Sequence, residues 1–244
     1  MNFELSEEQK MIQQSVERFV QENYDLSDRI KISSENPGYS KDYWNSMAEL
    51  GWLGLAFDEE DGGFGGNQID TLVLMEQFGK GLVLEPFLAN IVLAGGAIKR
   101  GASKALKESI IPKLIEGNLQ LTLAYAEEQS RFDIEDVATA AREDAGNFII
   151  NGKKSMVLNA ESADKVVVVT RTSGSQVDIN GISLFLVDLD SEGIERDNFP
   201  TVDGLRASEI TFKEVKVSAE NLIGEKDKGF SILQEVVNLS LIHI

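Results

Sequence analysis

Hydrophobic residues recur at helical spacing through the first half of the chain. Ser6, followed three residues later by Gln9, forms a capping-box pattern that predicts the start of a one-faced helix. The apolar stripe of this helix is Met11, Ile12, Val16, Phe19 and Val20. Ser40 is typical of an N-cap and predicts a second helix that ends at Gly51. Helical patterns also cover residues 69–78, 86–99 and 103–115, so the first half is predicted to be all helical.

The second half changes to the period of a strand. Short strands are predicted at residues 138–142, 148–150 and 153–158, joined by "EDAG" and by the hairpin dipeptide Asn151-Gly152. The runs "KVVVVTR" and "ISLFLVD" have the composition and length of buried strands, and "GIERDNF" and "SEITFKEVKV" complete the set. Because no helical stretch separates them, the strands predict a closed antiparallel barrel or sandwich and not a doubly wound α/β sheet.

A third change comes near the end of the chain. "NLIGEKDKGFSILQEVV" is typical of a loop followed by the first turns of a new helix, and the pattern then stops after "NLSLIHI" without a cap. We therefore expect a truncated chain in which residues 239–244 are candidates for foreign sequence. The predicted organisation is α+β: a helical domain over 1–118, a small antiparallel β-barrel domain over 119–225, and the start of a further helical domain over 226–244.

Charge and composition restrict the function. A chain of 244 residues suits one large or two medium domains. Its 41 acidic and 23 basic side chains give a net charge of −18, which repels phosphate backbones and argues against nucleic acid as a partner. Cysteine is absent and the single histidine is His243, so thiolate chemistry, a zinc site and a Ser-His triad are disfavoured, and no metal site is predicted.

The beginning of the chain and its hydropathy indicate the compartment. "MNFELSEEQK" is acidic and polar, unlike a signal peptide. No apolar run approaches the roughly 18 residues that a membrane helix needs. We therefore expect a cytoplasmic protein without a membrane span.

Two loops have functional alternatives. "DGGFGG" resembles a phosphate cradle only superficially, because it follows no strand and lacks the lysine and hydroxyl of a P-loop; an ordinary turn is favoured. "GASKALKES" offers two lysines to an anion, but a solvated helix face is favoured. The many carboxylates do not single out a general base by spacing, so the residues alone predict only a site between the two domains.

Four stretches carry a resemblance to a known family. They are "ELGWLGLAFDEEDGGFGG", "IIPKLIEGNLQLTLAYAE", "FIINGKKSMVLNAESADKVVVVTRT" and "GLRASEITFKEVKVSAENLIGEKDKGF". They occur in the order seen in acyl-CoA dehydrogenases, over about residues 5–237, and are most similar to the small subunit of pimeloyl-CoA-type dehydrogenases. The resemblance implies that the C-terminal helical bundle of the family is missing from this chain.

The resemblance assigns a role to the junction between the helical and β halves. The family places there a loop resembling Thr-Glu-Pro-x-x-Gly-Ser-Asp, which ends the strand that lies against the flavin ring. Glu127 matches its glutamate and Asp133 its aspartate, whereas Ala126, Glu128 and Phe132 stand where the family has threonine, proline and serine. The junction is thus similar to the flavin-edge loop in a diverged form.

A second flavin segment of the family resembles Trp-Ile-Thr, and here it reads Met156, Val157, Leu158. Leu158 lacks the hydroxyl that many members direct at flavin N5, but main-chain N–H groups and the polarizable Met156 still suit the ring. The alternative is that these are plain barrel-core residues. The residues that the resemblance implies for FAD are Leu123, Ala124, Tyr125, Ala126, Phe132, Met156, Val157 and Leu158.

The family's acyl channel implies substrate contacts. The helix predicted over 86–99 would offer Phe87 and Ile91 to the acyl chain, with Phe132 nearby, although packing between helices is the alternative for this apolar face. Arg206, in "GLRASEITF", is interpreted as a structural tie to a loop carbonyl or a carboxylate, with Asp203 and Glu209 as neighbouring partners, in preference to a contact with CoA phosphates.

The family's reaction removes the α-proton of an acyl-CoA thioester by a carboxylate and transfers the β-hydrogen as hydride to FAD. The base of most members lies in the missing domain, so no catalytic residue is assigned and the chain alone is expected to be inactive. An electron-transfer acceptor protein and a homo- or hetero-oligomer are implied. The alternatives are a non-catalytic subunit that supports a larger active partner, favoured by the altered flavin segments, and an unrelated binding module, disfavoured by the ordered motifs.

Overall fold

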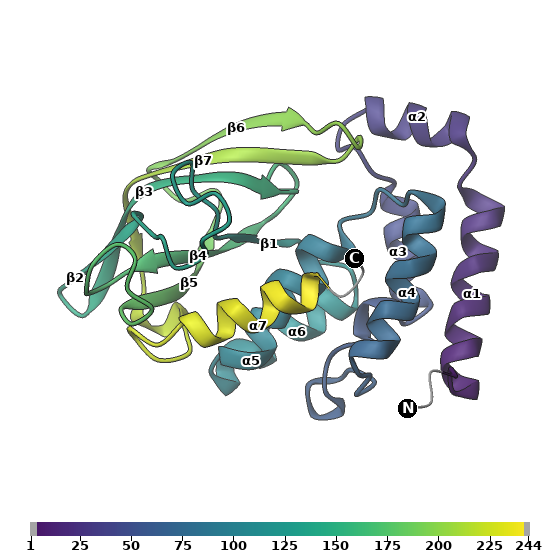
Figure 1. Ribbon diagram of the computed structural model, residues 1–244, viewed down its shortest axis with the longest axis horizontal. Coiled ribbons are helices and arrows are strands. Elements are labelled where there is room, and N and C mark those ends of the chain that lie inside the picture. The colour runs from purple at the N-terminus through teal and green to yellow at the C-terminus, as the bar shows by residue number, and fades with distance from the viewer. Residues whose placement is uncertain (1–3, 242–244) are drawn as a thin grey trace.

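A computed structural model describes residues 4–241 and shows helices at one end and strands at the other (Figure 1). The helices are α1 (Glu7–Asn23), α2 (Leu26–Ser34), α3 (Lys41–Glu49), α4 (Gln68–Gly81), the π-helix η3 (Leu88–Gly95), α5 (Gly96–Gly101), α6 (Lys104–Ile115) and α7 (Phe230–Ser240). The strands are β1 (Leu121–Ala124), β2 (Ala140–Asp144), β3 (Asn147–Leu158), β4 (Lys165–Arg171), β5 (Ile182–Asp188), β6 (Ile194–Pro200), β7 (Arg206–Val217) and β8 (Leu222–Ile223). His243 and residues 242–244 of the predicted foreign tail lie outside the described residues.

The predicted helical first half is confirmed, with its caps. Ser6 accepts a hydrogen bond from the Gln9 N–H, and the Gln9 side chain accepts from the Ser6 N–H, which completes the capping box. The Ser40 side chain caps α3 by accepting a hydrogen bond from the Tyr43 N–H. Helix α2 has no counterpart in the prediction. It has only nine residues, none of which is buried, and its apolar Leu26 and Ile30 are exposed.

The β half is one sheet of eight strands in which antiparallel pairs predominate, as predicted. The hydrogen-bonded order is β6-β7-β3-β2-β4-β5-β8, and β1 pairs with β4. The β1–β4 and β2–β4 pairs are parallel, while the others are antiparallel. Because β1 joins the sheet directly after the last helix of the first half, its end lies where the helical and β regions meet (Figure 1).

Strands β4 and β5 are buried on both faces, which explains their continuous hydrophobic runs. Val167 and Leu184 belong to the core shared with the helices, whereas Val168 and Phe185 belong to a second core inside the β region. The side-chain alternation of a strand thus supplies both cores at once.

The structure corrects the hairpin predicted at Asn151-Gly152. These residues lie inside the continuous strand β3, where the register against β7 shifts between Ile150 and Gly152. The Asn151 side chain accepts from the Glu214 N–H and donates to the Glu214 carboxylate, so it pairs across the sheet and does not form a turn. A side chain at position 152 would collide with Thr139, which explains the glycine.

The glycine-rich loop 61–66 is a packed turn, as predicted. The N–H groups of Gly63, Gly65 and Gly66 donate to the carbonyls of Asp58, Phe57 and Leu55 at 2.8–2.9 Å. These donors are therefore occupied within the loop. A phosphate cradle would need such groups to be free.

The C-terminal segment forms a helix, as predicted. Helix α7 packs against η3 and α5, with Val236 beside Gly96 and Ile232 beside Gly101 (Figure 1). Among residues 4–241, no helix has both the length and the apolar character required to cross a membrane.

Arg206 connects the β region to the helical region. Its Nη2 donates to the carbonyl oxygens of Ser33, in the last turn of α2, at 3.0 Å and of Glu35, directly after this helix, at 3.3 Å. The predicted tie to carbonyl oxygens is confirmed, and Arg206 Nε also lies 4.0 Å from the Glu161 carboxylate. Asp203 and Glu209, the carboxylates expected as partners, are not bound by Arg206. The Asp203 carboxylate accepts from its own loop and that of Glu209 pairs with Lys153.

We expect Arg206→Ala to lower the free energy of unfolding by about 1–3 kcal/mol, because charge-assisted bonds between the two regions are lost. Urea denaturation measures the change. Arg18→Ala, which removes an exposed ion pair on α1, serves as the control and should change the stability by less than about 1 kcal/mol. Equal losses in the two variants would contradict the tie.

Candidate functional site

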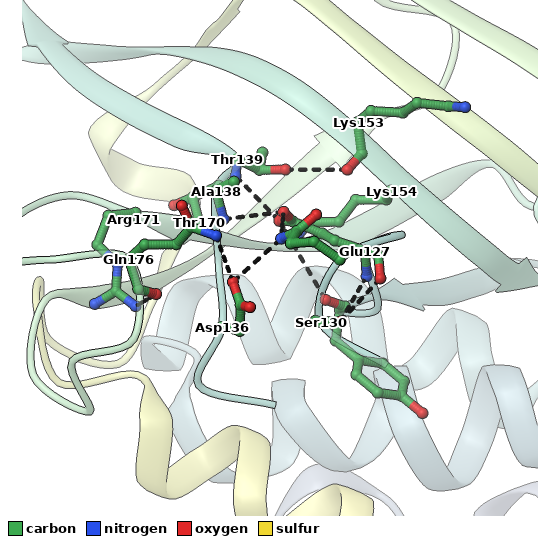
Figure 2. Close-up of polar contacts among 12 residues, drawn as sticks. Glu127, Ser130, Asp136, Ala138, Thr139, Lys153, Lys154, Thr170, Arg171 and Gln176 are labelled. Carbon is green, nitrogen blue, oxygen red and sulfur yellow. Dashed lines mark hydrogen bonds and ion pairs between the residues drawn. The ribbon is translucent and has the colours of Figure 1, made fainter. Parts of the chain in front are cut away.

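Glu127 organises the loop that leaves β1 (Figure 2). Its carboxylate accepts hydrogen bonds from the N–H groups of Ala138 at 2.9 Å and Thr139 at 3.0 Å. It also accepts from the side chains of Gln129 at 2.8 Å and Lys154 at 2.6 Å. One side chain therefore holds both ends of the 127–139 loop together.

The partner Lys154 extends inward from β3 and is fully buried. The exposed fractions of the Lys154 and Glu127 side chains are 0% and 3%. Burial lowers the pKa of Lys154 to about 8 against the opposing effect of Glu127. Burial also disfavours the charged form of Glu127, but Lys154 and the other donors outweigh it, so the pKa of Glu127 lies below its ordinary value. At neutral pH the pair is charged.

Arg171, at the end of β4, fixes the outer part of the same loop. Its guanidinium donates to the carbonyl oxygens of Glu135, Gln176, Asp178 and Asn180 at 2.7–2.9 Å. It thereby joins the 127–139 loop to the loop between β4 and β5 (Figure 2). Neither Lys154 nor Arg171 was predicted as a site residue. The only signal was their position in strands with apolar neighbours.

The structure brings the two predicted flavin segments together. The Ser155 N–H donates to the Ala126 carbonyl at 2.9 Å, and Lys154 Nζ donates to the Tyr125 carbonyl at 3.3 Å. Between Lys154 and Val157 the register of β3 against β7 shifts, and Met156 has φ 52°. This bulge leaves the Met156 side chain 51% exposed beside the end of β1.

The remaining residues predicted to bind the cofactor differ in how far their side chains are exposed. The side chains of Leu123, Ala124 and Val157 are buried in the two cores, so only their main chain could meet a ligand. The half-buried ones are Tyr125, Ala126 and Leu158. Phe132 is 96% exposed on the loop, and the structure gives it no contact with the paired segments.

A cavity of about 140 Å³ lies between the helical and β regions. Its wall includes Phe87 from the helical side and Leu158, Asn159 and Arg206 from the β side. Ile91 is not on this wall but faces a different hollow, beside Phe57 and the end of α7. Phe87 and Ile91 thus line different hollows, and their assignment to one acyl channel stays a prediction.

Glu85 is a buried carboxyl of this wall that sequence patterns missed. It is 5% exposed, and its Oε1 accepts from the Ser40 N–H at 3.1 Å. Burial raises its pKa to about 7, and the nearby N–H donors only partly oppose this. Among the described residues no cluster of three metal-ligating side chains occurs.

Comparison with known proteins identifies what the chain is similar to. Residues 6–118 match the family model described as acyl-CoA dehydrogenase, N-terminal domain, and residues 122–215 match acyl-CoA dehydrogenase, middle domain. Isovaleryl-CoA dehydrogenase of Pongo abelii is 29% identical over 96% of this chain and 57% of its own length. The caffeyl-CoA reductase-Etf complex subunit CarC of Acetobacterium woodii is 29% identical over 93% of this chain and 60% of its own length.

Solved structures show the same fold. The FAD complex of PigA has a TM-score of 0.86 at 25% identity and covers 97% of this chain and 63% of its own. Glutaryl-coenzyme A dehydrogenase with glutaryl-CoA has a TM-score of 0.87 at 24% identity. The match covers 98% of this chain and 62% of the chain in that structure. The chain spans about three fifths of the length of these proteins.

Breaking the buried pair should be costly. Lys154→Met is expected to lower the free energy of unfolding by about 3–5 kcal/mol, because it leaves the Glu127 carboxylate without its counter-charge. The double variant Glu127→Gln/Lys154→Met should lose less than the sum of its single variants. Urea denaturation of the three variants gives the coupling energy.

The neighbouring residue provides a control for this cycle. Lys153 forms a 2.8 Å pair with Glu209 but is exposed, so Lys153→Met should cost less than about 1 kcal/mol. If Lys154→Met costs no more than Lys153→Met, the buried pair does not have the structural role that its geometry indicates.

The raised pKa of Glu85 predicts a pH dependence of stability. Between pH 4.5 and 7 the folded protein holds a proton that the unfolded chain releases, so the stability falls as the pH rises through this window. Glu85→Gln removes this effect: it should match the wild type near pH 4.5 and exceed it by about 3 kcal/mol at pH 8. Urea denaturation at several pH values, with the exposed Glu60→Gln as control, measures the difference. A gap that does not grow with pH would contradict the assignment.

Proposed function

The chain belongs to the acyl-CoA dehydrogenase family, and we propose that the whole protein binds FAD and exchanges hydrogen between the flavin and the α and β carbons of an acyl-CoA thioester. The observation that carries this proposal is the joining of two segments at one surface: the end of β1 with Tyr125 and Ala126, and the bulge of β3 with Met156. In the family these two segments meet the flavin.

The surface suits a flat, partly apolar ring. Met156 offers an exposed thioether, which contacts aromatic systems favourably. We propose that main-chain groups of 124–126 and 156–158 contact the edge of the isoalloxazine ring, because most of the side chains there are buried or apolar. Phe132 would have to move to reach the ring, since its side chain is 96% exposed to solvent. FAD, when bound, accepts the hydride that leaves the β carbon.

The residues of this chain bind and orient. Glu127 and Lys154 fix the main chain of the 127–139 loop and of the β3 bulge, so the ring would meet a preorganised edge. Glu127 is unsuited to be the base, because it is buried and its carboxylate accepts four hydrogen bonds. No catalytic base is assigned.

Partners follow from the same proposal. The name of the caffeyl-CoA reductase relative includes an Etf complex. We propose that an electron-transferring protein exchanges electrons with the bound flavin and that the subunit assembles with copies of itself or with a homologous subunit. Acyl-CoA is the proposed substrate.

A second candidate is a non-catalytic subunit that keeps the fold and supports a larger active partner. Leu158 and Ala126, which replace the hydroxyl residues of the family motifs, favour this candidate. The discriminating experiment is anaerobic mixing of the FAD-loaded full-length protein with acyl-CoA thioesters. Bleaching of the flavin absorbance supports the enzyme, whereas a protein that binds FAD without being reduced supports the subunit.

We expect the full-length protein to bind FAD non-covalently, and Met156→Asp to weaken the binding at least about tenfold, because a carboxylate beside the ring must be desolvated. Quenching of FAD fluorescence on titration gives the dissociation constant. Met11→Asp is the matched control: Met11 is exposed on α1, far in sequence from both segments, and the change should leave the affinity unaltered. A wild-type protein that stays colourless after incubation with FAD would refute this proposal.

A further inference from the structure

The cavity between the helical and β regions gathers buried polar atoms that have no hydrogen-bond partner. In the described part of the chain, six buried side-chain nitrogen or oxygen atoms lack a hydrogen bond. Three of them belong to wall residues of this one cavity: Glu85 Oε2, Asn159 Nδ2 and Arg206 Nε. Arg206 Nε lies 4.0 Å from the Glu161 carboxylate, at ion-pair distance but without a hydrogen bond, so the unpaired atoms of Glu85 and Asn159 are the stronger indication. Glu85 and Asn159 are only 5% and 7% exposed. Buried polar groups are normally paired, so this concentration indicates a site for a polar group.

Local contacts place the three residues close to one another. The Asn159 N–H donates to the Arg206 carbonyl at 2.8 Å. The Arg206 side chain passes next to Gly38, and Glu85 accepts from the N–H of Ser40, two residues further along. The turn at 38–40 therefore connects the polar groups of the β side with the carboxyl of the helical side.

The unpaired atoms have complementary hydrogen-bonding roles. Asn159 Nδ2 and Arg206 Nε donate, whereas Glu85 Oε2 accepts as a carboxylate and donates when protonated. A hydroxyl group both accepts from the nitrogen atoms and donates to Glu85. A carboxylate would instead place a second negative charge beside Glu85, the carboxyl whose burial already disfavours ionisation.

Apart from Tyr39, the rest of the wall is apolar, and the cavity is small. The wall includes Met75, Phe78, Leu84, Phe87, Leu158 and Leu205. A volume of about 140 Å³ accommodates a benzene-sized group. Ordered water would satisfy the polar atoms but would leave the hydrocarbon wall without a partner, whereas a short aliphatic segment with one oxygen matches both.

We propose that this cavity receives the distal end of the acyl chain and selects a chain that carries a hydroxyl group there. The proposal rests on the proposed function, and Leu158 connects the two: it lines the cavity and belongs to the segment placed at the flavin. The polar atoms would then discriminate between acyl chains, since a chain without oxygen leaves them unpaired.

The test compares affinities within one protein. Calorimetric titration of the FAD-loaded full-length protein with ω-hydroxyacyl-CoA and unsubstituted acyl-CoA esters of four to twelve carbons should show, at one length, a preference of about tenfold or more for the hydroxylated ester. Glu85→Leu should abolish this preference, and Glu85→Gln, which keeps an acceptor, should retain most of it. The ratio within each variant is insensitive to partial loss of folded protein.

A failure of the hydroxyl preference can be distinguished from a failure of the proposed function. Equal affinities of both ester series, or a tighter ω-carboxyacyl ester, would overturn the inference while leaving the dehydrogenase proposal intact. If no acyl-CoA binds, the proposed function fails. Crystals soaked in cyclohexanol then show whether the cavity binds a hydroxyl group. A cyclohexanol hydroxyl between Glu85 and Asn159 would support the hydroxyl preference, whereas ordered water alone would refute it.

Discussion

The ion pair between Glu127 and Lys154 is the interaction on which the site depends. Both side chains are withdrawn from water, and each would be strongly destabilising without the other. The need to pair them fixes the end of β1 against β3, and the remaining lone pairs of the carboxylate draw in the start of the 138–139 segment. A loop with no glycine and no proline between residues 127 and 139 therefore still has a defined course.

The same principle of a buried polar group fixing the chain recurs where the helical and β regions meet. Asn90 of η3 is fully buried, and its side chain accepts from the Leu121 N–H and donates to the Leu119 carbonyl. It thus sets the direction in which β1 leaves the helical region. Together with Arg206, it makes the cavity between the regions a fixed feature, because both of its walls are attached by hydrogen bonds and by a shared hydrophobic core.

Local patterns predicted most elements because their causes are local. Ser6 and Ser40 satisfy helix N–H groups within three residues. The contiguous valines of β4 indicate a buried strand without reference to the rest of the chain. Two elements were missed or mispredicted. Helix α2 is short and has no fully buried residue, so it was not predicted. Asn151-Gly152 has the composition of a turn, but the side chain of Asn151 is paired with Glu214, in a strand more than sixty residues away.

By itself, the sequence determined the helical and β halves, the family motifs and the two segments proposed to meet FAD, since each of these is encoded in contiguous residues. Only the tertiary structure decided which of two adjacent lysines enters the core, since the strand alternation places one inside but the register of β3 chooses Lys154. It also decided that Phe87 and Ile91 face different hollows, and that Glu85, Asn159 and Arg206 share one. These outcomes depend on contacts between residues distant in the chain, which no local pattern records.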